Sequence, residues 1–162
     1  MYLPKRKPNR LINYNYSSNG MYFITVCTKN KEHLLGKIVG ATIGRPPEMC
    51  LSPYGEITKQ AIENINTHYP CVSVIKYVIM PNHLHLLLLI DNYNENGRPM
   101  VAPTISTLIQ QMKGYVSKQA GFSPWQKLFH DHIIRGEKDY QRIWEYIDTN
   151  PLKWKDDCFY SE

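Results

Sequence analysis

The sequence lacks any apolar run long enough to cross a membrane. A spanning helix needs about 20 consecutive apolar residues, whereas the longest run here, at residues 84–90, has only the length of a buried strand. The N-terminus is basic but has no apolar stretch behind it, so a secretory signal is not expected. We therefore expect a cytoplasmic protein with no membrane partner.

Cysteine is scarce and follows no pattern. The four cysteines form neither a CxxC pair nor any spacing typical of a zinc site. We expect reduced thiols, as in a reducing cytoplasm, rather than a disulfide framework. They are Cys27, Cys50, Cys71 and Cys158.

Basic charge and tyrosine are abundant instead. The formal net charge is +5, the isoelectric point is about 9.0, and there are 12 tyrosines. A positive surface attracts polyanions, nucleic acid first. Residues 1–20 combine cations with tyrosines, which is typical of an arm that pairs phosphates and stacks on bases, although a frayed terminus has a similar composition. The cations of this arm that we expect to contact nucleic acid are Lys5, Arg6, Lys7 and Arg10.

Hydrophobic patterning predicts alternating strands and helices after this arm. Stretches rich in β-branched and other apolar residues predict strands at 21–28, 72–80, 83–90 and 128–135. Helical spacing between capping residues predicts helices at 53–68, 105–120 and 139–149. The glycines and prolines of residues 36–50 predict an excursion without regular structure, and residues 91–103 predict a polar loop.

This order is β-α-β-β-α-β with an added C-terminal helix. It predicts a ferredoxin-like α+β fold with an antiparallel sheet and both main helices on one face. We expect a single domain at residues 21–155, preceded by the basic N-terminal arm at residues 1–20.

His83 and His85 are candidate metal ligands. They lie two residues apart on a predicted strand, so both imidazoles point to the same side of the sheet. Two adjacent imidazoles provide half of a divalent metal site. The structural alternative is a pair of hydrogen-bonded histidines at a strand end.

Tyr115 and Gln119 are the next candidates. They lie one turn apart on the second predicted helix and therefore face the same way. At about 100° of rotation per helical residue, Gln119 falls within the apolar stripe of this helix. A buried amide there needs a partner, such as a metal ion. Gly114 costs helix stability and would permit close approach of a DNA strand. The structural alternative is a boundary tyrosine and a glutamine near the helix end.

Three other polar residues are candidates for lining the site. His130 and His132 form a second alternating pair on the fourth predicted strand, where they could bind a phosphate or form a rival metal pair. Asn82 lies in the turn directly before His83.

Four stretches of the chain resemble the single-tyrosine HUH transposases, and most of all the branch of REP-associated tyrosine transposases. Residues 77–87 (YVIMPNHLHLL) resemble the HUH motif. Residues 110–119, 125–135 (WQKLFHDHIIR) and 146–154 (YIDTNPLKW) match in order and spacing. The likeness runs from about Tyr14 to Trp154, while residues 36–50 and 91–103 match poorly.

The resemblance implies a metal-dependent endonuclease and strand transferase that acts on single-stranded DNA beside hairpins or repeats. His83 and His85 would hold Mg²⁺ or Mn²⁺, and Gln119 stands where the family has its third protein ligand. Tyr115 would be the nucleophile that forms a 5′-phosphotyrosine bond. Lys113 and Lys118, on the same helix, are further candidates for DNA contact.

The sequence is also compatible with other functions. A catalytically silent, domesticated protein could bind DNA hairpins through the same surface. An RNA-binding ferredoxin-like domain would expose aromatic residues on its central strands, where this chain has histidines and leucines. An unrelated metallohydrolase would need more carboxylates near the histidines, where Asp91 is the one acid close by in sequence. The sequence leaves both monomer and homodimer open.

Overall fold

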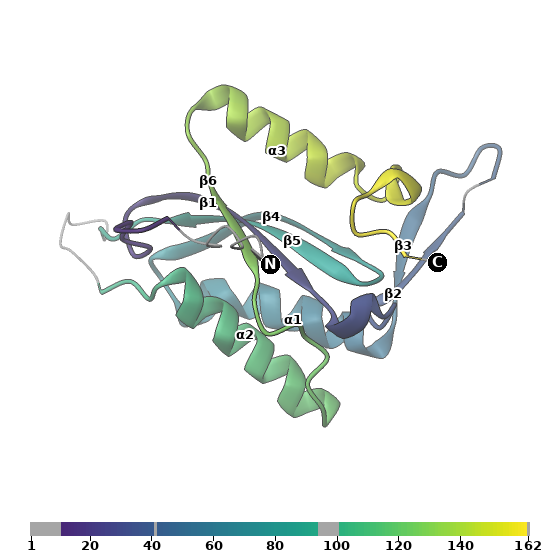
Figure 1. The fold of residues 1–162 in the computed structure, drawn as a ribbon, viewed down its shortest axis with the longest axis horizontal. Helices are drawn as coiled ribbons and strands as arrows, with labels where there is room; N and C mark the ends of the chain where they lie inside the picture. The colour runs from purple at the N-terminus through teal and green to yellow at the C-terminus, as the bar shows by residue number, and fades with distance from the viewer. Residues whose placement is uncertain (1–10, 41, 94–100, 162) are drawn as a thin grey trace, which may run out of the picture.

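A four-stranded antiparallel sheet forms the centre of the fold (Figure 1). The structure is a computed structural model, which describes residues 11–40, 42–93 and 101–161. The strand order is β4-β5-β1-β6. The strands are β1 (Gly20–Cys27), β4 (Val72–Met80), β5 (His83–Ile90) and β6 (His130–Ile133).

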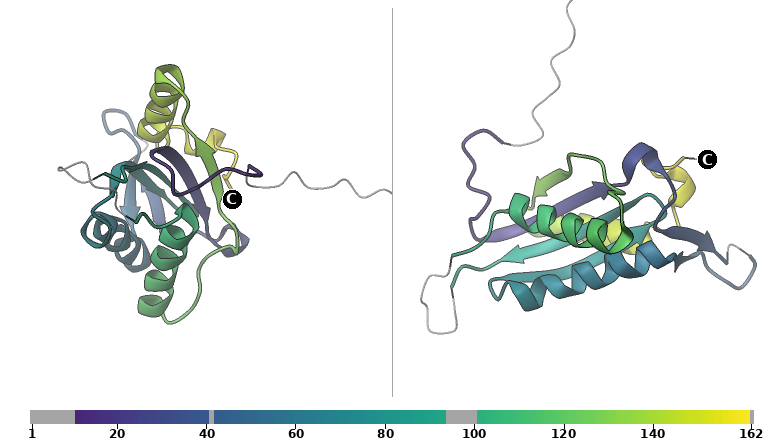
Figure 2. Two further views of the ribbon diagram at one scale, coloured as in Figure 1. Left: turned by 90° about the vertical axis from the view of Figure 1, so that its left-hand side faces the viewer. Right: turned by 90° about the horizontal axis from the view of Figure 1, so that it is seen from below.

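Helices cover both faces of this sheet. Helices α1 (Pro53–His68) and α2 (Ile105–Ala120) lie on one face, and α3 (Glu137–Thr149) lies on the other (Figures 1 and 2). The predicted ferredoxin-like α+β fold, with its additional C-terminal helix, is confirmed. The structure also contains two short 3₁₀ turns, η1 (Lys29–Lys31) and η2 (Trp154–Asp156).

The ends of the two main helices follow from local chemistry. The Ser52 hydroxyl accepts a hydrogen bond from the Gly55 amide at 3.1 Å, which starts α1. The Thr104 hydroxyl accepts from the Thr107 amide at 3.2 Å and starts α2 in the same way. Gly121 ends α2 with a φ of 80°, a left-handed conformation that favours glycine.

Strand β5 divides its side chains between two separate cores. Leu84, Leu86 and Leu88 belong to the large core beneath α1 and α2. Leu87 points the other way and packs with Ile143 and Ile147 of α3. Since side chains alternate along a strand, His83 and His85 share the face of Leu87, on the side of the sheet that α3 covers.

The prediction that residues 36–50 lack regular structure is wrong. They contain β2 (Gly36–Val39) and β3 (Glu48–Leu51), which pair antiparallel as a ribbon at one end of the molecule (Figure 1). Most of the glycines and prolines lie in the turn between these strands, so they do not interrupt the pairing.

Part of the predicted N-terminal arm packs against the domain. Tyr16 is buried, and the Tyr14 ring lies 5.0 Å from it and 6.4 Å from the Tyr22 ring. Tyr14 and Tyr16 therefore contribute to the core rather than to a free, base-stacking arm. Lys5, Arg6, Lys7 and Arg10 lie outside the described residues.

All four cysteines are free thiols, as predicted. Within the described ranges, no helix is both long enough and apolar enough to span a membrane.

Two glycine substitutions should change stability in opposite directions. A Cβ at Gly55 would collide with the Leu35 backbone carbonyl, so Gly55→Ala should destabilise the fold by about 1–3 kcal/mol. A Cβ at Gly114 meets nothing within 4 Å, so Gly114→Ala should stabilise α2 by about 0.5–1 kcal/mol. Urea unfolding of both variants measures this contrast, which equal effects of the two changes would contradict.

Candidate metal centre

Two buried histidines form the floor of the site. His83 and His85 have exposed fractions of 0% and 1%, and their ring centroids lie 4.7 Å apart. Each Nδ1 has a hydrogen-bond partner at 2.8 Å, Asn82 Oδ1 for His83 and Thr25 Oγ1 for His85. Both Nε2 atoms are buried and have no partner. A buried nitrogen without a partner is costly unless a ligand occupies it.

The surroundings fix the ionisation and orientation of these rings. The Asn82 amide group donates to the Phe159 carbonyl at 2.8 Å, so its oxygen must face His83 Nδ1 and accept from it. Nε2 of His83 therefore carries the lone pair, the arrangement that outer hydrogen bonds impose on metal-binding histidines. Burial lowers the pKa of His83 to about 4 and lowers the pKa of His85 well below its usual value. Both imidazoles are neutral near pH 7, which is the metal-binding form.

A carboxylate and an amide complete the cluster. Asp157 has a carboxylate oxygen within 4.8 Å of the ligand nitrogens of both histidines. Asn150 is buried, donates from Nδ2 to Asp157 Oδ2 at 2.7 Å, and has no partner for its Oδ1. The negative charge of Asp157 and, next, the nearby Asn150 amide oppose the lowering of the His83 pKa by burial. Two imidazole nitrogens with one carboxylate and one amide oxygen suit a divalent cation.

Tyr146 lies against this cluster from α3. Its ring centroid is 5.1 Å from that of His85, and its hydroxyl donates to Asp157 Oδ2 at 3.1 Å. Burial and, next, the negative charge of Asp157 raise the pKa of Tyr146. Tyr146 of α3 precedes Asn150 by four residues, and Asn150 caps the end of α3 in a helical conformation, so both side chains lie on the same side of the helix.

The segment after α3 closes the site. The Phe159 ring lies 4.7 Å from the His83 ring, and the Phe159 amide donates to Asp157 Oδ1 at 2.7 Å. Residues 157–161 thus build part of the site, beyond the predicted domain boundary at residue 155.

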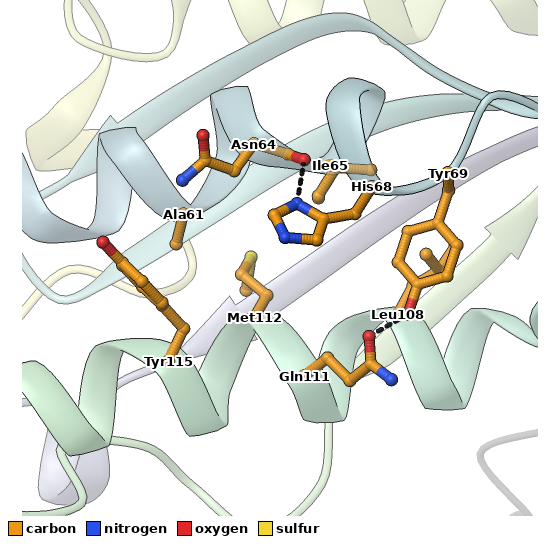
Figure 3. Close-up of a pocket in the computed structure, with 9 residues that line it drawn as sticks. All are labelled: Ala61, Asn64, Ile65, His68, Tyr69, Leu108, Gln111, Met112 and Tyr115. Carbon is orange, nitrogen blue, oxygen red and sulfur yellow. Dashed lines mark hydrogen bonds between the residues drawn. The ribbon is translucent and has the colours of Figure 1, made fainter.

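The structure does not bring Tyr115 and Gln119 to the histidines. Both lie on α2, which packs on the face of the sheet opposite the histidine side chains. Tyr115 lines a groove between α1 and α2, and its ring points towards α1 (Figure 3). The prediction that Gln119 is buried in the apolar stripe is wrong. It is exposed, because the last turn of α2 leads away from the sheet (Figure 1).

The lysines predicted on α2 have different environments. Lys113 Nζ donates to the backbone carbonyls of Gln126 at 2.8 Å and Leu128 at 3.3 Å, and burial lowers its pKa. It therefore fastens α2 to the segment before β6 rather than standing free for a phosphate. Lys118 is exposed, across the sheet from the histidines.

The second histidine pair lies on the edge strand β6. His130 aligns with Thr25 of β1, which aligns in turn with His85, so His130 is on the same face two strands away. His132 Nε2 instead contacts Asp139 Oδ2 at 2.7 Å. Neither histidine belongs to the cluster of His83, His85 and Asp157.

Metal-free protein should lose stability as the pH falls from about 6.5 towards 4. An unfolded histidine titrates near 6.5, whereas burial lowers the folded pKa of His83 to about 4. Below about pH 6.5, His83 binds a proton in the unfolded chain but not in the folded protein. The free energy of unfolding therefore decreases as the pH falls. Thermal unfolding in EDTA across this range measures the decline. The decline in stability with falling pH should be shallower for His83→Gln. An unchanged slope would contradict the attribution of this decline to His83.

The sequence held a usable signal for Tyr146 and Asn150. They have the same four-residue spacing that singled out Tyr115 and Gln119, and they lie in the stretch 146–154 that matches the HUH transposases. No comparable signal pointed to Asp157, because it follows the last helix and reaches the histidines only through the turn of the chain.

Known proteins are similar to this chain in sequence and in fold, although no family model matches it. An uncharacterised protein of Haemophilus influenzae is 37% identical, with 96% of this chain and 93% of the relative covered. The REP-associated tyrosine transposase of Escherichia coli is 23% identical over 85% of this chain and 70% of its own length. The solved structure of a REP-associated tyrosine transposase bound to a REP hairpin covers 90% of this chain and 74% of its own, with a TM-score of 0.65 and 22% identity. Together with the histidine motif and the ferredoxin-like fold, these relatives establish that the chain belongs to the family of REP-associated tyrosine transposases.

Proposed function

We propose that the protein is a metal-dependent endonuclease and strand transferase for single-stranded DNA, with Tyr146 as its nucleophile. The family relationship supports a transposase-like, DNA-processing function. The observation that carries the finer proposal is the hydrogen bond from the Tyr146 hydroxyl to Asp157, at the cluster formed by both histidines. Tyr146 and Asn150 thereby take the roles that the resemblance implied for Tyr115 and Gln119.

The residues of the cluster have complementary tasks in this reaction. His83, His85 and Asn150 would hold a Mg²⁺ or Mn²⁺ ion, which supplies charge neutralisation and orientation at the scissile phosphate. The Asp157 carboxylate already accepts the hydrogen bond of the Tyr146 hydroxyl, so it is positioned to take the phenolic proton.

The bond changes follow from this arrangement. The Tyr146 oxygen bonds to phosphorus while the bond from phosphorus to the 3′-oxygen breaks. The products are a 5′-phosphotyrosine and a 3′-hydroxyl, whose proton comes from solvent. Because the phosphotyrosine keeps a phosphodiester bond, transfer to another 3′-hydroxyl needs no external energy source.

The proposed substrate is single-stranded or hairpin DNA. The relative of known structure was solved bound to a REP hairpin. The high isoelectric point of this chain, about 9.0, fits a polyanionic partner.

The function is tested by trapping the covalent intermediate. The protein is incubated with 3′-labelled hairpin oligonucleotides from the repeats around its own gene, with Mg²⁺, with Mn²⁺ or with EDTA. We expect a labelled protein–DNA adduct that requires metal, and peptide mapping should locate the nucleotide on Tyr146. An adduct on another residue would overturn the assignment of the nucleophile.

The closed site favours one second candidate, a silent DNA-hairpin-binding protein. Phe159 covers His83, and Asp157 engages both Tyr146 and Asn150. Tight binding of the hairpins with no adduct in any metal would support this alternative over the nuclease.

A further inference from the structure

A second hollow adjoins the metal centre on the side of the β2–β3 ribbon. It is a cleft of about 600 Å³ between this ribbon and the segment that follows α3. Figure 1 shows the C-terminal segment beside the ribbon. The side chains of the cleft that carry the argument are His33, Lys37, Trp154, Lys155 and Tyr160.

Three rings meet in this cleft. The Trp154 ring lies 5.7 Å from the His33 ring and 5.2 Å from the Tyr160 ring, in edge-to-face contacts. Tyr160 and His33 are partly or fully accessible, while Trp154 is largely buried. The Trp154 ring also contacts the His83 ring of the metal centre, with 5.9 Å between the ring centroids. Trp154 therefore forms a wall shared by the cleft and the metal centre.

The cleft also carries cations without ion-pair partners. Lys37 and Lys155 are exposed, and neither forms an ion pair with a side chain in the described part of the chain. Asp156 is the one acid in the lining, and it leaves the two lysines in excess. Leu152, at the rim, is 54% exposed, so the cleft offers apolar surface beside its cations.

We propose that this cleft binds an unpaired nucleotide of the DNA strand next to the scissile phosphate. The base would pack on the rings of Tyr160 and His33, and Lys37 and Lys155 would pair with the flanking phosphates. Aromatic platforms beside a basic groove are the usual means of holding single-stranded DNA. The choice of DNA as ligand rests on the proposed function, whereas the position of the cleft rests on its contact with Trp154 and His83.

Binding without cleavage tests the cleft. Fluorescence anisotropy is measured in EDTA with a labelled single strand of mixed sequence. Tyr160→Ala should weaken binding by roughly fivefold to a hundredfold, as expected for one lost base stack, and Tyr160→Phe should restore it. The double variant Lys37→Ala/Lys155→Ala should also make the binding constant less dependent on salt. Each lost phosphate contact lowers the slope of log K against log salt concentration by about 0.7, so two lost contacts lower it by about 1.4.

A double variant with the same charge change is the control. Lys59→Ala/Lys127→Ala alters α1 and the segment before β6, neither of which lines the cleft, and should change affinity by less than about twofold. Equal weakening by the two double variants would overturn the proposal, because it would indicate only a general charge effect. Unchanged affinity of Tyr160→Ala would overturn it as well.

Position along the strand gives an independent readout. When 5-iodouracil replaces each base in turn, photo-cross-linking to Tyr160 or His33 is expected at one position beside the cleavage site. Cross-links spread evenly along the strand would contradict a defined nucleotide site. The two proposals fail separately: a missing adduct with intact cleft binding refutes the nuclease, and adduct formation with no cleft-dependent binding refutes the cleft.

Discussion

Tyr146→Phe should abolish covalent attachment to DNA, whereas Tyr115→Phe should leave it within about twofold of the unmodified protein. Removing a nucleophile lowers a rate by roughly 10⁴-fold or more. The Tyr146→Phe substitution removes only the hydroxyl that is hydrogen-bonded to Asp157, while the ring keeps its contact with His85. Tyr115 lies between α1 and α2 on the far side of the sheet (Figure 3). Adduct formation on labelled hairpin DNA measures both variants.

The same two substitutions serve as controls for folding and for subunit exchange. Both variants should unfold near the temperature of the original protein, because each loses a single hydroxyl group from a side chain that is not fully buried. If Tyr115→Phe alone abolished the adduct, the geometry within one chain could not explain catalysis. Mixing Tyr115→Phe with His83→Ala protein would then reveal whether a second copy supplies the tyrosine.

Metal binding should depend on the histidines in a graded way. His83→Ala or His85→Ala removes a nitrogen that has no protein partner, so Mn²⁺ affinity should fall by more than about a hundredfold. Asn82→Ala removes only the hydrogen bond that orients His83, so the loss should be about tenfold to a hundredfold. Calorimetric titration of Mn²⁺ into the protein, without DNA, measures these affinities.

Gln119→Ala is the matched control for the metal site. Gln119 is exposed on α2, across the sheet from both histidines, so its loss should not change Mn²⁺ affinity. Asn150→Ala, by contrast, should weaken binding because its buried Oδ1 lies at the cluster without a partner. A loss of affinity in Gln119→Ala with none in Asn150→Ala would reverse the assignment of the third ligand.

The sequence by itself determined most of the secondary structure and half of the candidate metal centre. Strands β4 and β5 and helix α1 have the predicted bounds, because alternation, helical spacing and caps act over a few residues. The pairing of His83 with His85 is equally local, since two residues separated by one on a strand must share a face. The ribbon of β2 and β3 was missed because glycines and prolines in its turn obscured two short strands.

Only the tertiary structure decided which tyrosine accompanies the histidines. Tyr115 with Gln119 and Tyr146 with Asn150 have identical helical spacing, so local geometry cannot separate them. What separates them is the face of the sheet that each helix covers, and that depends on contacts between residues far apart in sequence. The positions of Asp157 and Phe159 follow from the same cause, because the chain must return over the sheet after α3 before either side chain reaches His83.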